Sequence, residues 1–179
     1  TAINSSVDSI MGSGNLISKI YFPRIFIPLT PVIAGLLDFA IAFIVLLGML
    51  LFFHSWPSLT ILALPALIIL LVFTASGVGL LLAGLSTKYR DVKFMIPFLV
   101  QFWMFASPIV YPTSMIPDEY RLLYAINPMT GIIEGIRSCL TGANIPLDLI
   151  LVSVVVSALV FATGLIYFKK VERFFADII

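Results

Sequence analysis

Four long apolar runs constrain this chain more than any other feature of its sequence. They cover residues 31–53, 59–85, 94–111 and 147–168. Each is close to the ~20 apolar residues that a helix needs to cross the hydrocarbon core of a bilayer. Apolar residues are 61% of the chain and charged residues 11%, whereas soluble domains have roughly half and a quarter. We therefore predict an all-α, polytopic membrane protein, a four-span helical bundle forming a single domain over 1–179.

The charge and the rare residue types exclude several classes of function. A net charge of +1 argues against a nucleic-acid partner, which would need a basic face. Cys139 is the one cysteine and His54 the one histidine, so we predict no intrachain disulfide, no metal site and no catalytic residues. The chain begins at Thr1 without a signal-peptide pattern, and we expect it to be a C-terminal piece of a longer protein.

The stretch before the first run is mixed in polarity. Two glycines end any helix that arrives from upstream, and Asn15 can cap a short amphipathic helix over 16–22. Pro23 then stops this helix. Because the segment is too polar and too short to span a bilayer, we expect residues 1–29 to lie at the membrane surface.

Residues 115–141 contain no run that is long enough to span. Two short apolar segments, 120–126 and 129–140, are separated by Asn127 and Pro128. Broken helices at membrane depth normally line a cavity or pack inside protein. We therefore predict a re-entrant pair of half-length helices that enter and leave on the same side.

The basic residues indicate the orientation. Eight of the ten lie on one side of the predicted spans. These are Lys19, Arg24, Lys88, Arg90, Lys93, Lys169, Lys170 and Arg173. Only Arg121 and Arg137 fall on the other side. The positive-inside rule places the larger group, with residues 1–29 and the tail 169–179, in the cytoplasm, so the re-entrant pair lies on the outer side.

Four segments carry a family pattern in a consistent order and spacing. They are NLISKIYFPRIFIPL at 15–29, LSTKYRDVKFMIPFLVQFWMFASPIVYP at 85–112, INPMTGIIEGIR at 126–137 and FKKVERFFADII at 168–179. Together they resemble the permease subunits of type-2 ABC transporters, in the branch that exports polysaccharides such as O-antigen, capsule and teichoic acid. The resemblance covers essentially the whole chain. It implies the C-terminal two-thirds of such a subunit, because an interfacial helix and two further spans come first in complete members.

The resemblance also implies partners. Two permeases form a homodimer in the lipid of the bacterial inner (plasma) membrane, and each docks on a separate ATPase subunit that binds ATP and Mg. This chain has no G-x-x-x-x-G-K-[ST] phosphate loop, so we expect it to carry no cofactor and no enzymatic activity. The implied substrate is a lipid-linked glycan. The helix at 16–22 resembles the family's coupling helix, and the pair after Pro112 resembles its outer gate helices.

Seven cytoplasmic residues are candidates for contact with the ATPase. The coupling segment supplies Leu16, Lys19, Tyr21, Phe22 and Arg24, and the next cytoplasmic loop supplies Arg90 and Asp91. An aromatic knob can fill a pocket on a partner while a cation fixes the orientation. For the coupling segment, the alternative is an interfacial anchor whose basic side chains reach the lipid headgroups. For the loop, the alternative is contact with lipid headgroups and a topological stop, and an exposed ion pair of Arg90 with Asp91 would add only ~0–1 kcal/mol.

Further candidates lie in and between the spans. The proposed substrate path consists of Gln101, Phe102, Trp103 and Tyr111, and the outer gate consists of Asn127, Pro128, Glu134 and Arg137. Amphipathic side chains suit a sugar conduit, although membrane aromatics also face lipid or pack between helices. Glu134 and Arg137 can pair across one helical turn. Asp38 lies inside the first run, where a carboxylate requires a partner or water. We expect it to make a structural hydrogen bond or a substrate contact rather than to couple transport to protons.

Two other functions compete with polysaccharide export. A type-2 ABC exporter of drugs or small lipids would have the same architecture and a different conduit. A membrane enzyme would need a histidine, a metal cluster or paired acids within the spans. The sequence shows no such set there, and Asp38 is the one acid away from the ends of the spans. An ion-coupled secondary transporter usually has repeated halves with broken helices in corresponding positions, whereas this chain has one broken pair.

Overall fold

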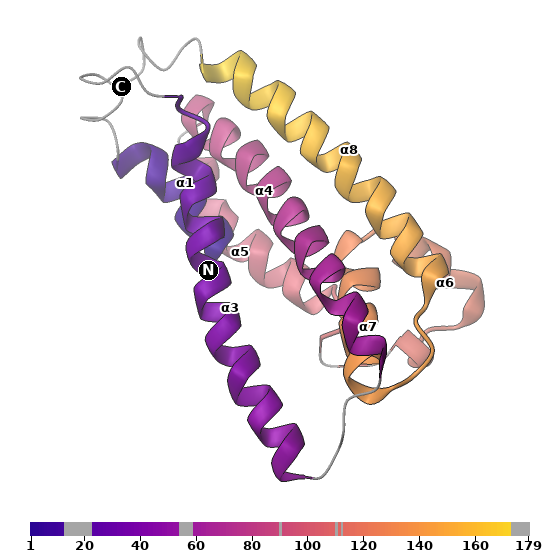
Figure 1. Cartoon of the computed structure of the whole chain (residues 1–179). Helices are drawn as coiled ribbons and strands as arrows, with labels where there is room; N and C mark the ends of the chain where they lie inside the picture. Colours follow the sequence, from indigo (N-terminus) through magenta and orange to yellow (C-terminus); the bar gives the residue numbers. More distant parts are fainter. Residues whose placement is uncertain (13–22, 54–58, 90, 110, 112, 173–179) are drawn as a thin grey trace. The chain divides into compact units, whose positions relative to one another are not determined.

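A computed structural model describes residues 1–12, 23–53, 59–89, 91–109, 111 and 113–172. All regular structure in these residues is helical (Figure 1). The helices are α1 (Ala2–Gly12), α3 (Phe26–Phe52), η1 (Leu59–Ala63), α4 (Leu64–Lys88), α5 (Val92–Phe105), η2 (Thr113–Met115), α6 (Asp118–Tyr124), α7 (Pro128–Thr141) and α8 (Leu147–Glu172). The predicted all-α class is confirmed.

Three helical segments in this part of the chain are long and apolar enough to cross a membrane. They are Phe26–Phe52, Thr60–Lys88 and Leu147–Glu172. A helix satisfies its backbone hydrogen bonds internally, which is what lipid requires of a spanning segment. The chain is therefore a polytopic helical membrane protein. Helix α5 is also apolar but has 14 residues, and at 1.5 Å per residue its length of about 21 Å is less than the ~30 Å bilayer core.

The helix bounds differ from those expected, for local chemical reasons. α3 begins at Phe26 rather than at 31, because Pro28 falls in the first turn, where its missing N–H costs no hydrogen bond. α5 ends at Phe105, whereas the predicted span continues to 111. The hydroxyl of Ser107 donates to the carbonyl of Trp103 at 2.8 Å and caps this end. The following proline, Pro108, cannot continue the helix.

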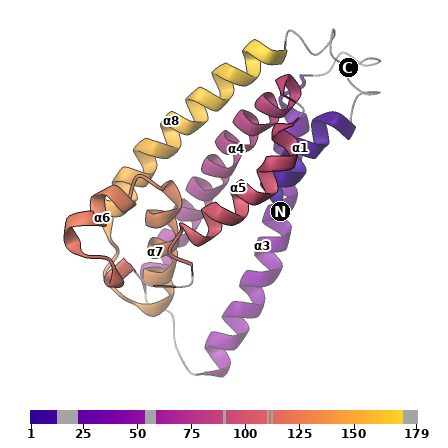
Figure 2. The same cartoon turned by 180° about the vertical axis from the view of Figure 1, so that it is seen from behind.

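Two short helices, α6 and α7, occupy the region where a pair of half-length helices was predicted (Figure 2). Asn127 caps α7 by accepting a hydrogen bond from the N–H of Met129 at 3.1 Å, and Pro128 follows at the first helical position. Gly142 ends α7 with a left-handed φ of 72°. The hydroxyl of Thr130 donates to the carbonyl of Tyr124 at 3.0 Å, which joins the start of α7 to the end of α6.

The chain divides into two compact units, and four of its helices contribute residues to both. The first unit comprises Thr1–Leu36, Val72–Phe102 and Ala158–Ile179, and the second comprises Leu37–Leu71 and Trp103–Ser157. The core of the first unit consists of Ile10, Leu80, Ala83, Phe168 and Val171. The core of the second unit consists of Leu64, Leu67 and Cys139, with α7 packed against η1.

In the first unit, α4 and α8 approach closely through glycines. A Cβ on Gly77 would lie 2.7 Å from the Cα of Phe161, and a Cβ on Gly164 would collide with the carbonyl oxygen of Gly77. Beside this contact the rings of Phe73 and Phe161 stack with centroids 4.2 Å apart. Small residues are typical of close helix contacts in membranes, and here they place α8 directly against the second apolar run.

Helix α1 compensates for a proline inside α3. In an uninterrupted helix the N–H of residue 31 would bond the carbonyl of Ile27, but Pro31 has no N–H. The hydroxyl of Ser9 in α1 lies 3.2 Å from that carbonyl and can donate to it. The same hydroxyl lies 2.7 Å from the carbonyl of Ser6. Ser9 therefore connects α1 to the beginning of α3, at the point where Pro31 interrupts the backbone hydrogen bonds of α3.

Candidate functional site

The predicted ATPase-docking residues fall mostly outside the described residues. Leu16, Lys19, Tyr21 and Phe22 lie in 13–22, and Arg90 is also outside the described residues. Their docking role stays a prediction. Arg24 is described and half-buried, and its Nη1 donates to the carbonyl oxygen of Glu172 at the end of α8, at 2.9 Å. Asp91 is exposed at the start of α5.

The second unit contains a polar network centred on Asn127. Its Oδ1 accepts hydrogen bonds from the indole Nε1 of Trp103 at 2.9 Å and from the N–H of Met129. Its Nδ2 donates to the carbonyl of Ala106 at 3.2 Å and to the hydroxyl of Ser107 at 2.9 Å. The amide thus has partners for two donors and two acceptor positions, which is its full capacity. Through Asn127 the beginning of α7 is held against the end of α5.

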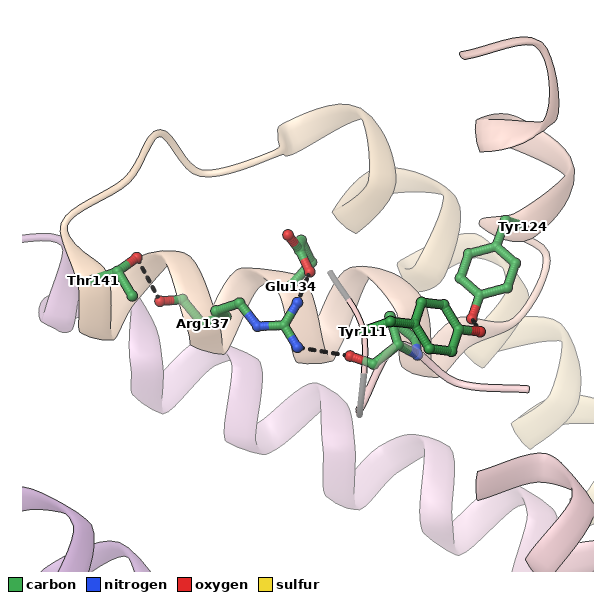
Figure 3. Close-up of polar contacts among 6 residues, drawn as sticks. Tyr111, Tyr124, Glu134, Arg137 and Thr141 are labelled. Atoms are coloured by element: carbon green, nitrogen blue, oxygen red, sulfur yellow. Dashed lines mark hydrogen bonds and ion pairs between the residues drawn. The ribbon is translucent and has the colours of Figure 1, made fainter. Parts of the chain in front are cut away.

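Arg137 makes the second connection between α7 and the segment after α5. Its Nη1 lies 2.7 Å from Oε2 of Glu134 and its Nη2 donates to the carbonyl of Pro108 at 2.8 Å (Figure 3). Glu134 is 17% exposed and Arg137 32% exposed, so solvent screens the ion pair only in part. The predicted pairing of Glu134 with Arg137 is thus present, and the guanidinium fork adds a backbone contact that spacing alone did not indicate.

Two tyrosines make the third connection. The hydroxyls of Tyr111 and Tyr124 are hydrogen-bonded, and Figure 3 shows the two side chains meeting at their oxygens. Burial, and then the hydrogen bond with Tyr111, raise the pKa of Tyr124 above its ordinary value. The Tyr124 phenol therefore stays neutral over the physiological pH range. Tyr111 comes from the segment after α5 and Tyr124 from the end of α6.

These three connections define one polar network, made of Trp103, Ser107, Pro108, Tyr111, Tyr124, Asn127, Glu134 and Arg137. It includes three of the four residues that were predicted for the outer gate. Two of the residues predicted for the substrate path, Trp103 and Tyr111, use their polar atoms within this network. Its polar groups face one another rather than a bound group, and no metal-binding set of three acidic, His or Cys side chains occurs in the described ranges. The arrangement holds the short helices in position against the segment after α5.

The other two predicted path residues belong to an exposed stripe on α5. Phe98 is 75% and Phe102 73% exposed, and Gln101 lies beside them on the same helix. Phe94 and Phe105, also exposed, extend the stripe at helical spacings of three and four residues. We call these five residues the α5 stripe. It is an aromatic surface with a single amide, presented by a helix that is too short to cross the membrane alone.

Asp38 has an unexpected position. It is exposed on α3, in a helix whose other residues are almost all apolar, and it has no hydrogen bond or ion pair to another residue within the described ranges. A carboxylate at membrane depth needs water or a partner. Asp38 was predicted to make either a structural hydrogen bond or a substrate contact, and both roles stay predictions.

Sequence reasoning missed several members of this polar network. Ser107, Pro108 and Tyr124 were not among the candidate residues, and their partners in the network are 13 to 29 residues away along the chain. One local signal was present. An asparagine followed by proline before an apolar segment is the pattern of a helix N-cap, and a cap with spare hydrogen-bonding capacity can also serve a neighbouring segment.

Comparison with known proteins gives a consistent result. The family described as ABC-2 type transporter matches residues 1–141. An O-antigen export system permease protein RfbA of Myxococcus xanthus is 25% identical, with 97% of this chain and 68% of that protein aligned. A protein of the same description from Klebsiella pneumoniae is 24% identical, with 100% of this chain and 70% of that protein aligned. These relatives are longer than this chain, and they are named as permeases rather than as enzymes.

Proposed function

The chain belongs to the ABC-2 type transporter family, and we propose that it is the membrane-spanning subunit of an ATP-driven exporter of lipid-linked polysaccharide. Membership of the family implies work with an ATPase subunit. ATP and Mg²⁺ bind that partner, because this chain has no phosphate loop. The proposal takes its substrate class from the two O-antigen export permeases that align with almost all of the chain. The chain moves its substrate without making or breaking a bond in it.

The α5 stripe is the observation that best supports this substrate class. Sugar rings present C–H faces that pack on aromatic rings, while their hydroxyls bond to amides. The exposed Phe98, Gln101 and Phe102 offer both kinds of contact on one helix face. A lipid-facing surface would not need a glutamine, since an amide without hydrogen-bond partners in hydrocarbon costs several kcal/mol, about 2–7 on transfer scales.

A homodimer completes the conduit in this proposal. One α5 stripe forms a single wall, and a second copy related by a two-fold axis would supply the facing wall. The bilayer is the bacterial inner membrane, with the C-terminus in the cytoplasm. Its support is the distribution of basic residues, since Arg24, Lys88, Lys93, Lys169 and Lys170 all belong to the first unit.

Export by paired variants tests the role of the α5 stripe. The full-length permease carrying F98A/F102A is expressed with its ATPase in cells that lack the native chain. We expect a lower amount of polymer at the cell surface, accumulation of lipid-linked glycan inside, and unchanged levels of the permease–ATPase complex. The control is L37A/I41A, which trims exposed apolar side chains of α3. An equal loss of surface polymer in both double variants would show that the α5 stripe does not line the substrate path. Accumulation of a drug or small lipid, rather than of lipid-linked glycan, would favour the competing hypothesis of a drug or small-lipid exporter.

Docking on the ATPase is tested separately at the predicted coupling segment. The variant Y21A/F22A should reduce co-purification of the permease with its ATPase, because it removes the aromatic knob that fills a pocket on the partner. Full recovery of the complex by this variant would show that the two aromatics are interfacial anchors. Surface polymer should fall together with complex formation.

A further inference from the structure

The two stretches that flank the predicted coupling segment are bonded to different helices of the first unit. On the upstream side, Oδ1 of Asp8 in α1 lies 2.8 Å from Nζ of Lys93 in the first turn of α5. On the downstream side, Nη1 of Arg24 donates to the backbone carbonyl of Glu172, the last residue of α8, at 2.9 Å. Within the described residues, each flank therefore makes a charged contact with a distant part of the chain.

The contact of Arg24 brings a positively charged donor to the C-terminal part of α8. A helix dipole favours a cation toward the C-terminal side of a helix, and the guanidinium of Arg24 donates to the carbonyl of Glu172. Lys169 and Lys170, nearby in the same helix, are exposed. The contact therefore comes from a residue 148 positions earlier in the sequence.

Apolar packing makes the same region stiff. Ile25 and Ile27, just after Arg24, pack on the core that contains Ile10 of α1, Leu80 of α4 and Phe168 of α8. Ser9 adds its hydrogen bond to the carbonyl of Ile27. Close-packed interiors deform little and transmit displacement, so the flanks cannot move without moving the ends of the helices that they contact.

We propose that Asp8 and Arg24 are positioning residues that transmit movement of the coupling segment to α5 and α8, respectively. This inference rests on the proposed function, because the movement originates in the partner ATPase. Lys93 immediately precedes Phe94, the first residue of the α5 stripe, so a displacement at Asp8 reaches the stripe through a single ion pair. Arg24 gives α8 an equivalent connection.

The ion pair is better suited to transmission than to stability. Asp8 is 58% and Lys93 36% exposed, and exposed pairs contribute only about 0–1 kcal/mol to folding. Breaking it should therefore leave the protein folded and inserted. A purely structural role would change thermal stability, whereas a transmitting role changes the amount of substrate exported for each ATP hydrolysed.

Charge reversal in the complete permease–ATPase complex tests the upstream contact. D8K and K93D are each expected to lower export per ATP hydrolysed at least about five-fold, the lower end of typical coupling between sites. The double variant D8K/K93D restores the ion pair and should recover export. Complex yield and ATP hydrolysis should stay near wild type. Unchanged export in both single variants, or no recovery in the double variant, would overturn the inference for Asp8.

The downstream contact is tested by substitution of Arg24. R24Q should uncouple export from ATP hydrolysis, while R24K should retain part of the coupling because it keeps the charge and loses the planar fork. The control K169Q removes an exposed cation from the same end of α8 and should have no effect. If R24Q prevents complex formation, Arg24 is a docking residue and its transmitting role is wrong. If the wild-type chain itself does not bind the ATPase, the proposed function fails instead.

Discussion

At the scale of single residues, Asn127 links more parts of the second unit than any charged group there. Its side chain joins the N-terminus of α7 to Trp103, Ala106 and Ser107 near the end of α5. Buried polar groups stabilise a fold only when all their hydrogen bonds are made. The position therefore requires an amide, with a donor and an acceptor at fixed places, rather than any small polar residue.

Replacement of Asn127 by Asp tests this requirement. Aspartate keeps the N-cap and the acceptor for Trp103, but it places an oxygen against the carbonyl of Ala106. We expect N127D to lower the free energy of unfolding by about 1–3 kcal/mol, the cost of an unsatisfied polar group. Thermal denaturation in detergent, followed by size-exclusion chromatography, measures the change. The control N144D alters an exposed asparagine after α7 and should melt like wild type.

Arg137 gives a second prediction at this scale. R137M leaves Glu134 without its ion-pair partner and the carbonyl of Pro108 without its donor, so we expect a loss of about 1.5–3 kcal/mol. R137M/E134L should be less destabilised than R137M alone, because it removes the carboxylate that would otherwise be unpaired. Equal melting temperatures for the two variants would show that water replaces the ion pair and that Arg137 is not required for the network.

At the scale of helices, contacts between backbones decide how α4 and α8 pack. Gly77 and Gly164 allow the two helices to touch without intervening side chains. Helix α8 is buried at Leu149, Ser153, Ser157, Gly164, Phe168 and Val171, positions that are three, four or seven residues apart. These spacings keep the buried positions on one face of the helix, although the composition of α8 is apolar nearly all round.

The variant G164A tests this close contact. Its Cβ would collide with the carbonyl of Gly77, which belongs to the backbone and cannot rotate away. The helices must separate, and we expect a loss of about 1–3 kcal/mol from overpacking. G48A is the matched control, since Gly48 lies in α3 with nothing near its Cβ, and it should be neutral or slightly stabilising. A normal melting temperature for G164A would contradict the close packing.

At the scale of the whole molecule, the two units differ in charge as well as in core. The described basic residues of the first unit are Arg24, Lys88, Lys93, Lys169 and Lys170, whereas those of the second unit are Arg121 and Arg137. Cytoplasmic segments of membrane proteins are enriched in Lys and Arg. The orientation proposed for the chain follows from this division.

Labelling of single cysteines tests the orientation. In a C139A background, which removes the native buried thiol, N144C and K170C place one cysteine at an exposed position of each unit. A membrane-impermeant maleimide is applied to spheroplasts whose inner membrane is intact. It should label N144C at once and K170C only after the membrane is permeabilised. The opposite pattern would invert the topology, and labelling of both before permeabilisation would contradict separation by a bilayer.

The sequence by itself determined the membrane class, the helical content and the presence of two short helices after Tyr111. These properties are local, because a run of about 20 apolar residues that spans a bilayer must make all its backbone hydrogen bonds within itself, whatever the rest of the chain does. The N-cap at Asn127 and the pair of Glu134 with Arg137 were also readable, since their geometry follows from helical spacing.

Only the tertiary structure decided which groups meet. Arg24 and Glu172 are 148 residues apart, Arg137 and Pro108 are 29 apart, and no pattern within either segment requires those contacts. The same applies to Trp103 and Tyr111. Their amphipathic side chains led to the prediction that they line the substrate path, and in the fold their polar atoms also hold the short helices. Hydrogen-bond partners across a fold depend on how helices pack, and packing is a property of the whole chain rather than of any one segment.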